Sequence, residues 1–573
     1  MLKQKVVAAI DFGTHGSGYA WAVISPQNDD PQRRQIKVRT QWPSQPIAAA
    51  KNLTALVVDP SGDVTAWGWE AKRLAASGIL EGHYVDSFKM QLIGSKIGIE
   101  AGASSNSEGV KLVEQYLHQL YVAAVEDIGK TGYREDEIRW CLTVPAIWDD
   151  YQKQMMWKAA VAAGLPDDEK RLIFAIEPEA AAHYARVAGV RTLGATGGRR
   201  ANLMSTGSRF IVADCGGGTI DVTAYRSDVG GKLVEIGRDF GGAFGSEYLN
   251  KAFIELAAEK LGGPTVLAKI AATKPTAFME FIANWERAKL AVALEPRHDV
   301  SITIPAALDR LLNEDIRTEL ASGQDGIDDH LILAPSDLKQ IFESVVPRVL
   351  ALVDKQIDEI QKSGRRSTGE LVMLVGGFGA SPYLQEALER HLSGKAEVLL
   401  PPEPGVAVLQ GAAHFAYDPQ VISRRSKYTY GCESTMPFRA GTDPLSKRRV
   451  ARRDGLARCD DRFSRFVAAG QVVGVDEAVT QAYYPVEDDQ TGVSFGFYRT
   501  RKENPTYVDE PNVERIGSLR VDYDEKMLAL PIERKGIALS MFFGDTRIRV
   551  RASLVETNES VEVELDFDSK MGR

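Results

Sequence analysis

Two copies of one short pattern constrain the fold of this chain more than any other feature of its sequence. In each copy an apolar strand-like run ends in an aspartate, a glycine-rich turn follows, and a second β-branched run returns. The first copy covers residues 6–24 around Asp11, and the second covers residues 210–225 around Asp214. Because two hairpins with the same unusual turn stand about two hundred residues apart, the sequence predicts an internally duplicated fold.

Both turns suit the binding of a polyphosphate with a divalent cation. Glycines let backbone N–H groups approach phosphate oxygens because no Cβ stands in the way. Thr14 and Thr219 add hydroxyl donors, and Asp11 and Asp214 can hold Mg²⁺, mainly through its water ligands. Each turn could also be a plain hairpin, but three consecutive glycines in the second turn are unfavourable in a hairpin that binds nothing. The phosphate-binding motif G-x-x-x-x-G-K-S/T is absent.

Strand-like and helical patterns alternate from the N-terminus to about residue 418. Strand-like runs at 139–144 and 172–176 are each followed by a helical pattern, and a stretch rich in Gly, Ser and Thr at 192–208 interrupts the alternation. A long amphipathic pattern at 336–363 predicts one helix that is kinked at Pro347. This alternation predicts an α/β fold for the larger part of the chain.

From about residue 418 to the end, strand-like alternation replaces the helical pattern and predicts an all-β domain. Its clearest hairpin alternates apolar with basic residues over 547–554, and apolar with acidic residues over 561–567. Folding at 556–559 would set Val550 opposite Leu565 and Arg551 opposite Glu564. One face of this hairpin would then be wholly apolar.

The composition excludes several classes of protein. The chain has 573 residues, 44% of them hydrophobic, and a formal net charge of −9, which disfavours a disordered chain and a globally basic nucleic-acid binder. The four cysteines lie far apart without a C-x-x-C pair, so we predict a reducing compartment and neither a disulfide scaffold nor a zinc ribbon. No apolar run approaches the roughly 20 residues that span a bilayer. Asp11 also stops the first apolar run too early for a signal peptide. We therefore expect a cytoplasmic protein without a membrane span.

The order and spacing of six sequence blocks resemble the heat-shock protein 70 (DnaK-like) family of the actin-like ATPase superfamily. The resemblance covers roughly residues 5–418, and the variant forms of the blocks look most like the divergent, lidless member-twelve branch. It implies a two-lobed actin-like ATPase domain with duplicated ribonuclease-H-like halves, lobe I at 1–200 and lobe II at 201–418. A β-rich, substrate-binding-like domain without a helical lid would follow at 419–573. The blocks begin at Ile10, Leu142, Ile176, Asp214, Trp285 and Leu374.

The resemblance also implies that ATP or ADP binds with Mg²⁺ and that ATP is hydrolysed slowly. Among the catalytic residues, Lys89 would contact the γ-phosphate and Glu177 would orient the attacking water, with Asp214 and Thr219 beside them. Taken alone, Lys89 would be a solvated lysine and Glu177 a helix N-terminal acid. The metal would be held by Asp11, Asp214 and Asp221, although Asp221 could equally be a strand-edge charge. His15 replaces a hydroxyl residue of the family's first phosphate turn, and it either donates to a phosphate or points away. The residues that the resemblance assigns to the phosphates are Gly13, Thr14, Gly216, Gly217, Gly218 and Thr219.

On the nucleoside side the resemblance departs from the family pattern. Members of the family hold adenine between two arginines, whereas the matching positions here are Leu290 and Ala380. The loss of both cation–π contacts predicts weaker adenine affinity and looser base selectivity. The remaining residues that the resemblance assigns to the nucleotide are Gly241, Gly242, Glu286, Lys289, Gly376, Gly377 and Phe378.

The implied partner is a protein client or a co-chaperone, which the β-domain would bind, for example by edge pairing with an extended segment. A basic cluster at 447–458 is either a solvated hairpin face or a site for an acidic client, nucleic acid or anionic lipid. Three alternatives share the fold: a pseudo-ATPase scaffold that binds nucleotide without turnover, a sugar kinase and an actin-like filament former. The basic cluster consists of Lys447, Arg448, Arg449, Arg452, Arg453 and Arg458.

Overall fold

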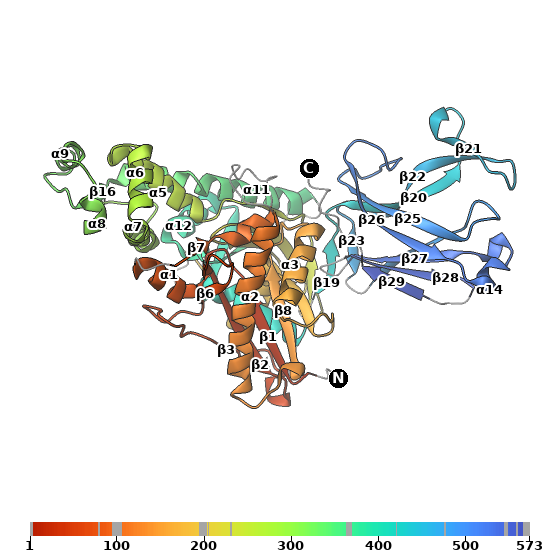
Figure 1. Cartoon of the computed structure of the whole chain (residues 1–573), viewed down its shortest axis with the longest axis horizontal. Coiled ribbons are helices and arrows are strands. Elements are labelled where there is room, and N and C mark those ends of the chain that lie inside the picture. Colours follow the sequence, from red (N-terminus) through yellow and green to blue (C-terminus); the bar gives the residue numbers. More distant parts are fainter. Residues whose placement is uncertain are drawn as a thin grey trace. The chain divides into compact units, whose positions relative to one another are not determined.

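The computed structural model divides the chain into two compact units, whose elements are labelled in Figure 1. Unit 1 comprises Met1–Ile147, Met155–Gly231 and Asp239–Gln420, and unit 2 comprises Trp148–Gln154, Lys232–Arg238 and Val421–Arg573. Among the described helices, none is long and apolar enough to cross a membrane. The structure describes residues 4–77, 81–93, 106–193, 203, 205–229, 232–362, 370–419, 421–474, 477–543, 548–556 and 560–564.

The first repeated hairpin lies at the centre of a mixed sheet in unit 1. Strand β1 (Val6–Asp11) pairs antiparallel with β2 (Gly16–Val23) and parallel with β8 (Ile138–Val144), which pairs with β9 (Leu172–Ile176). All residues of β1 are buried, which explains why this strand is an uninterrupted apolar run up to Asp11. Two short strands, β3 (Lys37–Val38) and β4 (Asn52–Leu53), both pair with β2.

The second hairpin has the same neighbours in a second sheet of unit 1. Strand β11 (Arg209–Cys215) pairs antiparallel with β12 (Ile220–Ser227) and parallel with β17 (Glu370–Val375), as β1 does with β2 and β8. The sheet continues through β18 (Ala396–Leu400) to β10 (Arg191–Thr192), and β14 (Phe240–Gly242) pairs with β12. The pattern that occurs twice in the sequence therefore folds in the same way twice.

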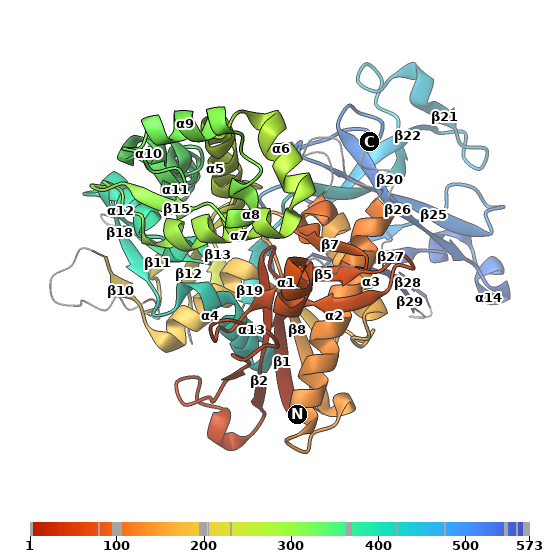
Figure 2. The same ribbon diagram turned by 60° about the vertical axis from the view of Figure 1, so that its left-hand side comes forward.

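The helices of unit 1 pack against these sheets and against one another. Helix α4 (Glu177–Ala188) follows β9 directly and packs along α13 (Ala407–Tyr417). Figure 2 shows α5 (Glu247–Lys260), α6 (Pro264–Thr273) and α7 (Pro275–Ala288) in one group. Unit 1 also contains α1 (Gly68–Ser77), α2 (Asn106–Gly129), α8 (Ala306–Asp309), α9 (Glu314–Ser322), α12 (Pro382–Leu392) and the larger part of α3 (Asp150–Ala162). The smaller strands are β5 (Ala55–Val58), β6 (Val64–Trp67), β7 (His83–Asp86), β15 (Val300–Thr303) and β16 (His330–Leu333).

The prediction of one kinked helix over 336–363 is wrong. The structure has two helices there, α10 (Pro335–Glu343) and α11 (Val346–Lys362). Pro347 has no N–H to donate to a preceding turn, and its ring restricts the backbone before it. A proline is well tolerated only in the first turn of a helix, so α11 starts anew at this point.

Unit 2 is built mainly of strands and contains the short helix α14 (Glu525–Leu528). Aromatic and aliphatic residues of its two larger sheets, among them Phe497, Leu539 and Val550, form one buried cluster. One sheet orders β21 (Arg448–Val450), β22 (Ala457–Val467), β20 (Thr429–Pro437), β25 (Gly492–Thr500) and β26 (Val513–Asp522). The other orders β24 (Ala478–Tyr483), β27 (Ile537–Phe542), β28 (Arg549–Leu554) and β29 (Ser560–Glu564). Strand β19 (Val421–Arg425) pairs with β13 (Leu233–Glu235) and β23 (Val472–Gly474).

The predicted register of the last hairpin is wrong by two residues. Val550 lies opposite Val563, and Arg551 lies opposite Glu562. The side-chain period of a strand is two, so a shift of two residues keeps the same residues on the same face. Val550, Ala552 and Leu554 are accordingly buried, as the alternation predicts. The predicted partner Leu565 lies outside the described residues.

Candidate functional site

The two glycine-rich turns lie against each other in unit 1. A Cβ placed on Gly218 would lie 2.5 Å from Thr14 Oγ1 and 2.5 Å from Met90 Sδ, and one on Gly217 would lie 2.4 Å from His15 Cδ2. These separations leave no room for a side chain. The glycines of the second turn therefore let it approach the first turn closely.

The start of helix α5 holds the second turn in place. Backbone N–H groups of Gly245, Ser246 and Glu247 donate to the carbonyl oxygens of Gly218, Gly216 and Gly217, at 3.0, 3.1 and 2.9 Å.

The carbonyl oxygens of the second turn therefore all have hydrogen-bond donors within the protein. Within the part of the chain that the structure describes, the N–H groups of Gly217 and Gly218 have no protein acceptor. Backbone donors of this kind are suited to the oxygens of an anion. In the first turn, by contrast, the Gly13 N–H donates to Ser17 Oγ at 3.1 Å.

Asp11 is buried at the end of β1, and both of its oxygens contact other side chains. The Thr143 hydroxyl donates to Oδ1 at 2.9 Å, and the Lys51 ammonium lies 2.6 Å from Oδ2. Lys51 precedes β4, outside every sequence block that suggested a site, so the sequence pattern gave no signal for it. The structure thus adds a cation to the predicted carboxylate position.

Lys89 and Glu177 form a buried ion pair. Lys89 Nζ donates to Glu177 Oε1 at 2.9 Å, and the two side chains are 5% and 10% exposed. Burial raises the pKa of Glu177, and the nearby charge of Asp11 adds to the rise, while Lys89 opposes it. Lys89 is therefore buried beside a carboxylate, whereas its sequence context alone would place it on a solvated polar face.

Asp214 lies at the end of β11 and is paired in register with Asp221 of β12. Burial raises the pKa of Asp214 well above its usual range, and Glu177, Asp221 and Asp11 raise it further by repulsion, while Lys51 lowers it. Asp221 is also buried, and its Oδ1 accepts a hydrogen bond from the Ile147 N–H at 2.7 Å. The four carboxylates that the sequence assigned to catalysis and metal binding therefore lie close enough to influence one another.

The substitution Asp214→Asn should stabilise the nucleotide-free protein at neutral pH. Because the pKa of Asp214 is higher in the folded than in the unfolded state, wild-type stability falls as pH rises from about 4 toward the folded pKa. Asparagine removes this cost, which we expect to be worth about 1–2 kcal/mol at pH 7 and nothing below pH ~4. Thermal melts of both proteins across this pH range measure the difference. A variant that melts below wild type at pH 7 would contradict the prediction.

Residues assigned to the nucleoside form a second polar cluster around Asn250 of α5. The Asn250 amide donates to Glu286 Oε1 at 3.0 Å, and its oxygen accepts from Lys289 Nζ at 2.8 Å and from Trp285 Nε1 at 3.1 Å. Burial lowers the pKa of Lys289, although Glu286 and Glu247 oppose this effect. Glu286 and Lys289 thus lie on one face of α7 and its continuation, as their spacing predicts.

The third glycine block also reaches the phosphate turns. Gly376 has a φ of +86°, and a Cβ there would lie 2.3 Å from the Cys215 carbonyl oxygen and 2.5 Å from Asp214 Oδ1. Gly377 is exposed next to it, whereas Phe378 is buried. Leu290 and Ala380 are both exposed.

Gly241 and Gly242 have local packing roles. They lie in β14 beside β12, with Gly241 opposite Asp221 and Gly242 opposite Ile220. A Cβ on Gly241 would lie 2.3 Å from Ile147 Cγ2 and 2.4 Å from the Ile220 carbonyl oxygen, and one on Gly242 would meet Phe244. These glycines allow close packing within their own sheet, and their assignment to the nucleotide stays a prediction.

Glu247 lies beside the phosphate turns, and no sequence motif pointed to it. Its Oε1 accepts a hydrogen bond from Ser87 Oγ at 2.6 Å and lies 4.0 Å from His15 Nε2. Ser87 adopts a φ of +56°, a left-handed conformation that is uncommon for residues other than glycine. Strained residues of this kind often lie at functional sites, and Ser87 is two residues from Lys89.

The site fits a polyphosphate better than it fits a metal bound directly by three carboxylates. Within the described ranges, no group of three or more His, Cys, Asp or Glu side chains is placed to hold a metal ion. Asp11, Asp214 and Asp221 could still face Mg²⁺ through its water ligands, because Mg²⁺ keeps several of its waters in proteins.

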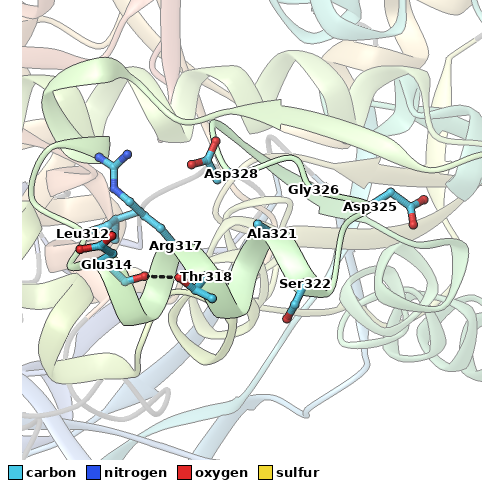
Figure 3. Close-up of a pocket in the computed structure, with 9 residues that line it drawn as sticks. All are labelled: Leu312, Glu314, Arg317, Thr318, Ala321, Ser322, Asp325, Gly326 and Asp328. Carbon is cyan, nitrogen blue, oxygen red and sulfur yellow. Dashed lines mark hydrogen bonds between the residues drawn. The ribbon is translucent and has the colours of Figure 1, made fainter.

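A cavity of about 910 Å³ lies elsewhere in unit 1, beside α9 (Figure 3). Its lining includes Glu314, Arg317 and Asp328, and Arg317 is already paired with Asp309 at 2.8 Å. None of the residues that the sequence assigned to nucleotide lines this cavity. It is therefore separate from the candidate site.

Comparisons with known proteins agree with the sequence blocks. A family model described as "Domain of unknown function (DUF8340)" matches residues 204–401. Heat shock 70 kDa protein 12A of Mus musculus is 28% identical over 98% of this chain and 91% of the relative. Heat shock 70 kDa protein 12B of Homo sapiens is 28% identical with the same coverage. Chaperone protein DnaK of Thermoplasma volcanium is 27% identical over 47% of this chain and 39% of the relative.

Proposed function

Because this chain belongs to the heat-shock protein 70 family, on the branch of heat shock 70 kDa proteins 12A and 12B, we propose that it binds ATP with Mg²⁺ and hydrolyses it slowly. The close approach of Gly217 and Gly218 to Thr14 and His15 is the observation that carries this proposal. Two turns with backbone donors and hydroxyl groups then surround one polyphosphate. The relatives imply an actin-like ATPase fold, in which such a site lies between two lobes.

The proposed reaction is an in-line attack of water on the γ-phosphate. The water oxygen bonds to the γ-phosphorus, the bond from that phosphorus to the β–γ bridging oxygen breaks, and ADP leaves. Lys89 donates hydrogen bonds to the γ-phosphate and offsets the charge that develops on it. Glu177 accepts a hydrogen bond from the attacking water, and its raised pKa favours taking up the proton. Asp11, Asp214 and Asp221 would face Mg²⁺ through its waters, and the metal would supply charge neutralisation at the β- and γ-phosphates.

Two measurements on the full chain test this function. Calorimetric titration with ATP and Mg²⁺ should show binding with one site per chain. A single-turnover assay with radiolabelled ATP should then show phosphate release above the rate without protein. Binding without turnover would support the pseudo-ATPase scaffold, and absence of binding would reject the proposal.

Base selectivity should be weaker than in relatives that hold adenine between two arginines. The exposed Leu290 and Ala380 cannot supply the cation–π contacts, which are worth roughly 0.5–2 kcal/mol each. We therefore expect GTP to bind within about tenfold of ATP. Competition of both nucleotides against a fluorescent ATP analogue measures the ratio. Strong exclusion of GTP would show that other residues of the site select adenine.

We further propose that nucleotide state controls the affinity of the C-terminal region for a protein client or co-chaperone.

The basic cluster supports a protein partner better than nucleic acid or lipid, because carboxylates of unit 2 already neutralise most of its positive charge. These ion pairs are Lys447 with Asp461 and Asp509, Arg449 with Asp460, Arg452 with Asp489, Arg453 with Asp488, and Arg458 with Asp454.

Anionic vesicles give a direct test of that preference. In about 0.15 M salt, where exposed charges are screened beyond roughly 8 Å, vesicles rich in phosphatidylserine should not retain the full chain in a sedimentation assay. Neutral vesicles are the control. Retention on anionic vesicles that is lost in Lys447→Ala/Arg448→Ala would reverse the assignment.

A further inference from the structure

Lys51 is a cation of the candidate site that no sequence block assigned. Its position is set by strand pairing, because the next residues, Asn52 and Leu53, pair with β2 at Ser17 and Gly16. A Cβ on Gly16 would lie 3.3 Å from the Lys51 Cβ, so the backbone of Lys51 lies close to the first glycine-rich turn. Lys51 is therefore held in the site by the sheet and does not belong to an isolated surface loop.

The ammonium of Lys51 occupies the side of Asp11 that is left open by Thr143. Lys51 Nζ is 2.6 Å from Asp11 Oδ2, and the Thr143 hydroxyl donates to Oδ1. The Asp11 side chain is 4% exposed, whereas that of Lys51 is 27% exposed. An ammonium group has three donors, so one contact with Asp11 leaves donors for a ligand.

The charges around Lys51 show why a cation is needed at this point. Four acids, Asp11, Glu177, Asp214 and Asp221, share the site, and Lys89 neutralises Glu177. Repulsion among these acids acts on Asp214, and Lys51 counters it. Without a cation at Asp11, an incoming phosphate would meet an uncompensated buried carboxylate, which is strongly unfavourable.

We propose that the Lys51 ammonium occupies the position at Asp11 that Mg²⁺ would otherwise take, and that it contacts the polyphosphate. The affinity for nucleotide then depends more on Lys51 than on Mg²⁺. The inference rests on the proposed nucleotide binding and narrows the role of Asp11 within it. Asp11 then positions Lys51, and the metal depends on Asp214 and Asp221.

Binding of a non-hydrolysable ATP analogue in excess Mg²⁺ and in EDTA tests the proposal by calorimetry on the full chain. Wild type should lose less than about tenfold in affinity when Mg²⁺ is removed. In EDTA, Lys51→Met should bind the analogue about a hundredfold or more weaker than wild type does, since one charge-assisted contact is gone and Asp11 becomes a repelling charge. Lys51→Arg keeps the charge and should behave like wild type.

Two further variants separate this role from a structural one. Lys51→Met/Asp11→Asn removes both charges and should recover most of the affinity in EDTA, even if Lys51→Met alone is unstable. Lys37→Met is the matched control. Lys37 belongs to β3 of the same sheet, lies over the ring of Trp21 in β2 and contacts no residue of the site.

The two hypotheses fail in different ways. If wild type binds the analogue and Lys51→Met binds it in EDTA as tightly as wild type does, the role of Lys51 is rejected and the proposed function stands. If wild type does not bind the analogue in either condition, the proposed function itself is rejected.

Discussion

The substitution Gly218→Ala should lower the affinity for ATP with Mg²⁺ by about ten- to a hundredfold while the protein remains folded. The new Cβ would lie 2.5 Å from Thr14 Oγ1, well inside van der Waals contact. Met90 can move away because its side chain is flexible, but Thr14 is a short β-branched residue of the first turn. The two turns must therefore separate, and the backbone donors on one side of the polyphosphate lose their position.

The matched control is Gly129→Ala. Gly129 ends helix α2, and a Cβ there would have no atom within 4 Å. This variant should bind ATP like wild type, and both variants should melt within a few degrees of it. If Gly218→Ala binds ATP with unchanged affinity, the two turns do not hold the phosphates together.

The largest expected effect on turnover comes from Glu177→Gln. Glutamine keeps the shape of the side chain and can still accept from Lys89, but it cannot take a proton from water. We expect the single-turnover rate to fall by about 10²–10³-fold, with ATP affinity within a few-fold of wild type. Lys89→Ala should reduce the rate by a similar factor, since it removes charge stabilisation at the γ-phosphate.

Stability distinguishes these two variants. Lys89→Ala leaves the buried Glu177 without its 2.9 Å partner, and breaking such a pair costs about 3–5 kcal/mol. Its melting temperature should fall, and that of Lys89→Ala/Glu177→Gln should recover. The control Lys130→Ala removes an exposed lysine that is paired with Asp127, and it should change neither the single-turnover rate nor the melting temperature. Equal rates in wild type and Glu177→Gln would indicate a scaffold that does not turn ATP over.

The sequence predicted those parts of the site that depend on short, local patterns. Each repeated hairpin is a buried apolar strand that ends in an aspartate, so its place in a sheet follows from hydrophobic periodicity and turn chemistry. The order of the six blocks predicted the family, and the relatives confirm it.

Other contacts could not be predicted because they depend on tertiary structure. Lys51 meets Asp11 only through the pairing of β4 with β2, and Glu247 reaches Ser87 only through the packing of α5. The register of β28 and β29 escaped prediction because alternation fixes the face of a strand but not its partner. The break before Pro347 was expected as a kink, since hydrophobic periodicity continues on both sides of it.

Affinity as a function of phosphate number tests the central claim most directly. The claim is that the turns containing Thr14 and Gly216 to Gly218 hold the β- and γ-phosphates of one nucleotide. Calorimetric titration of the full chain with AMP, ADP and ATP in Mg²⁺ should then show affinity rising at each step, by about tenfold or more per phosphate. Equal affinity for AMP and ATP would contradict the account, because the two turns would then contribute nothing to binding.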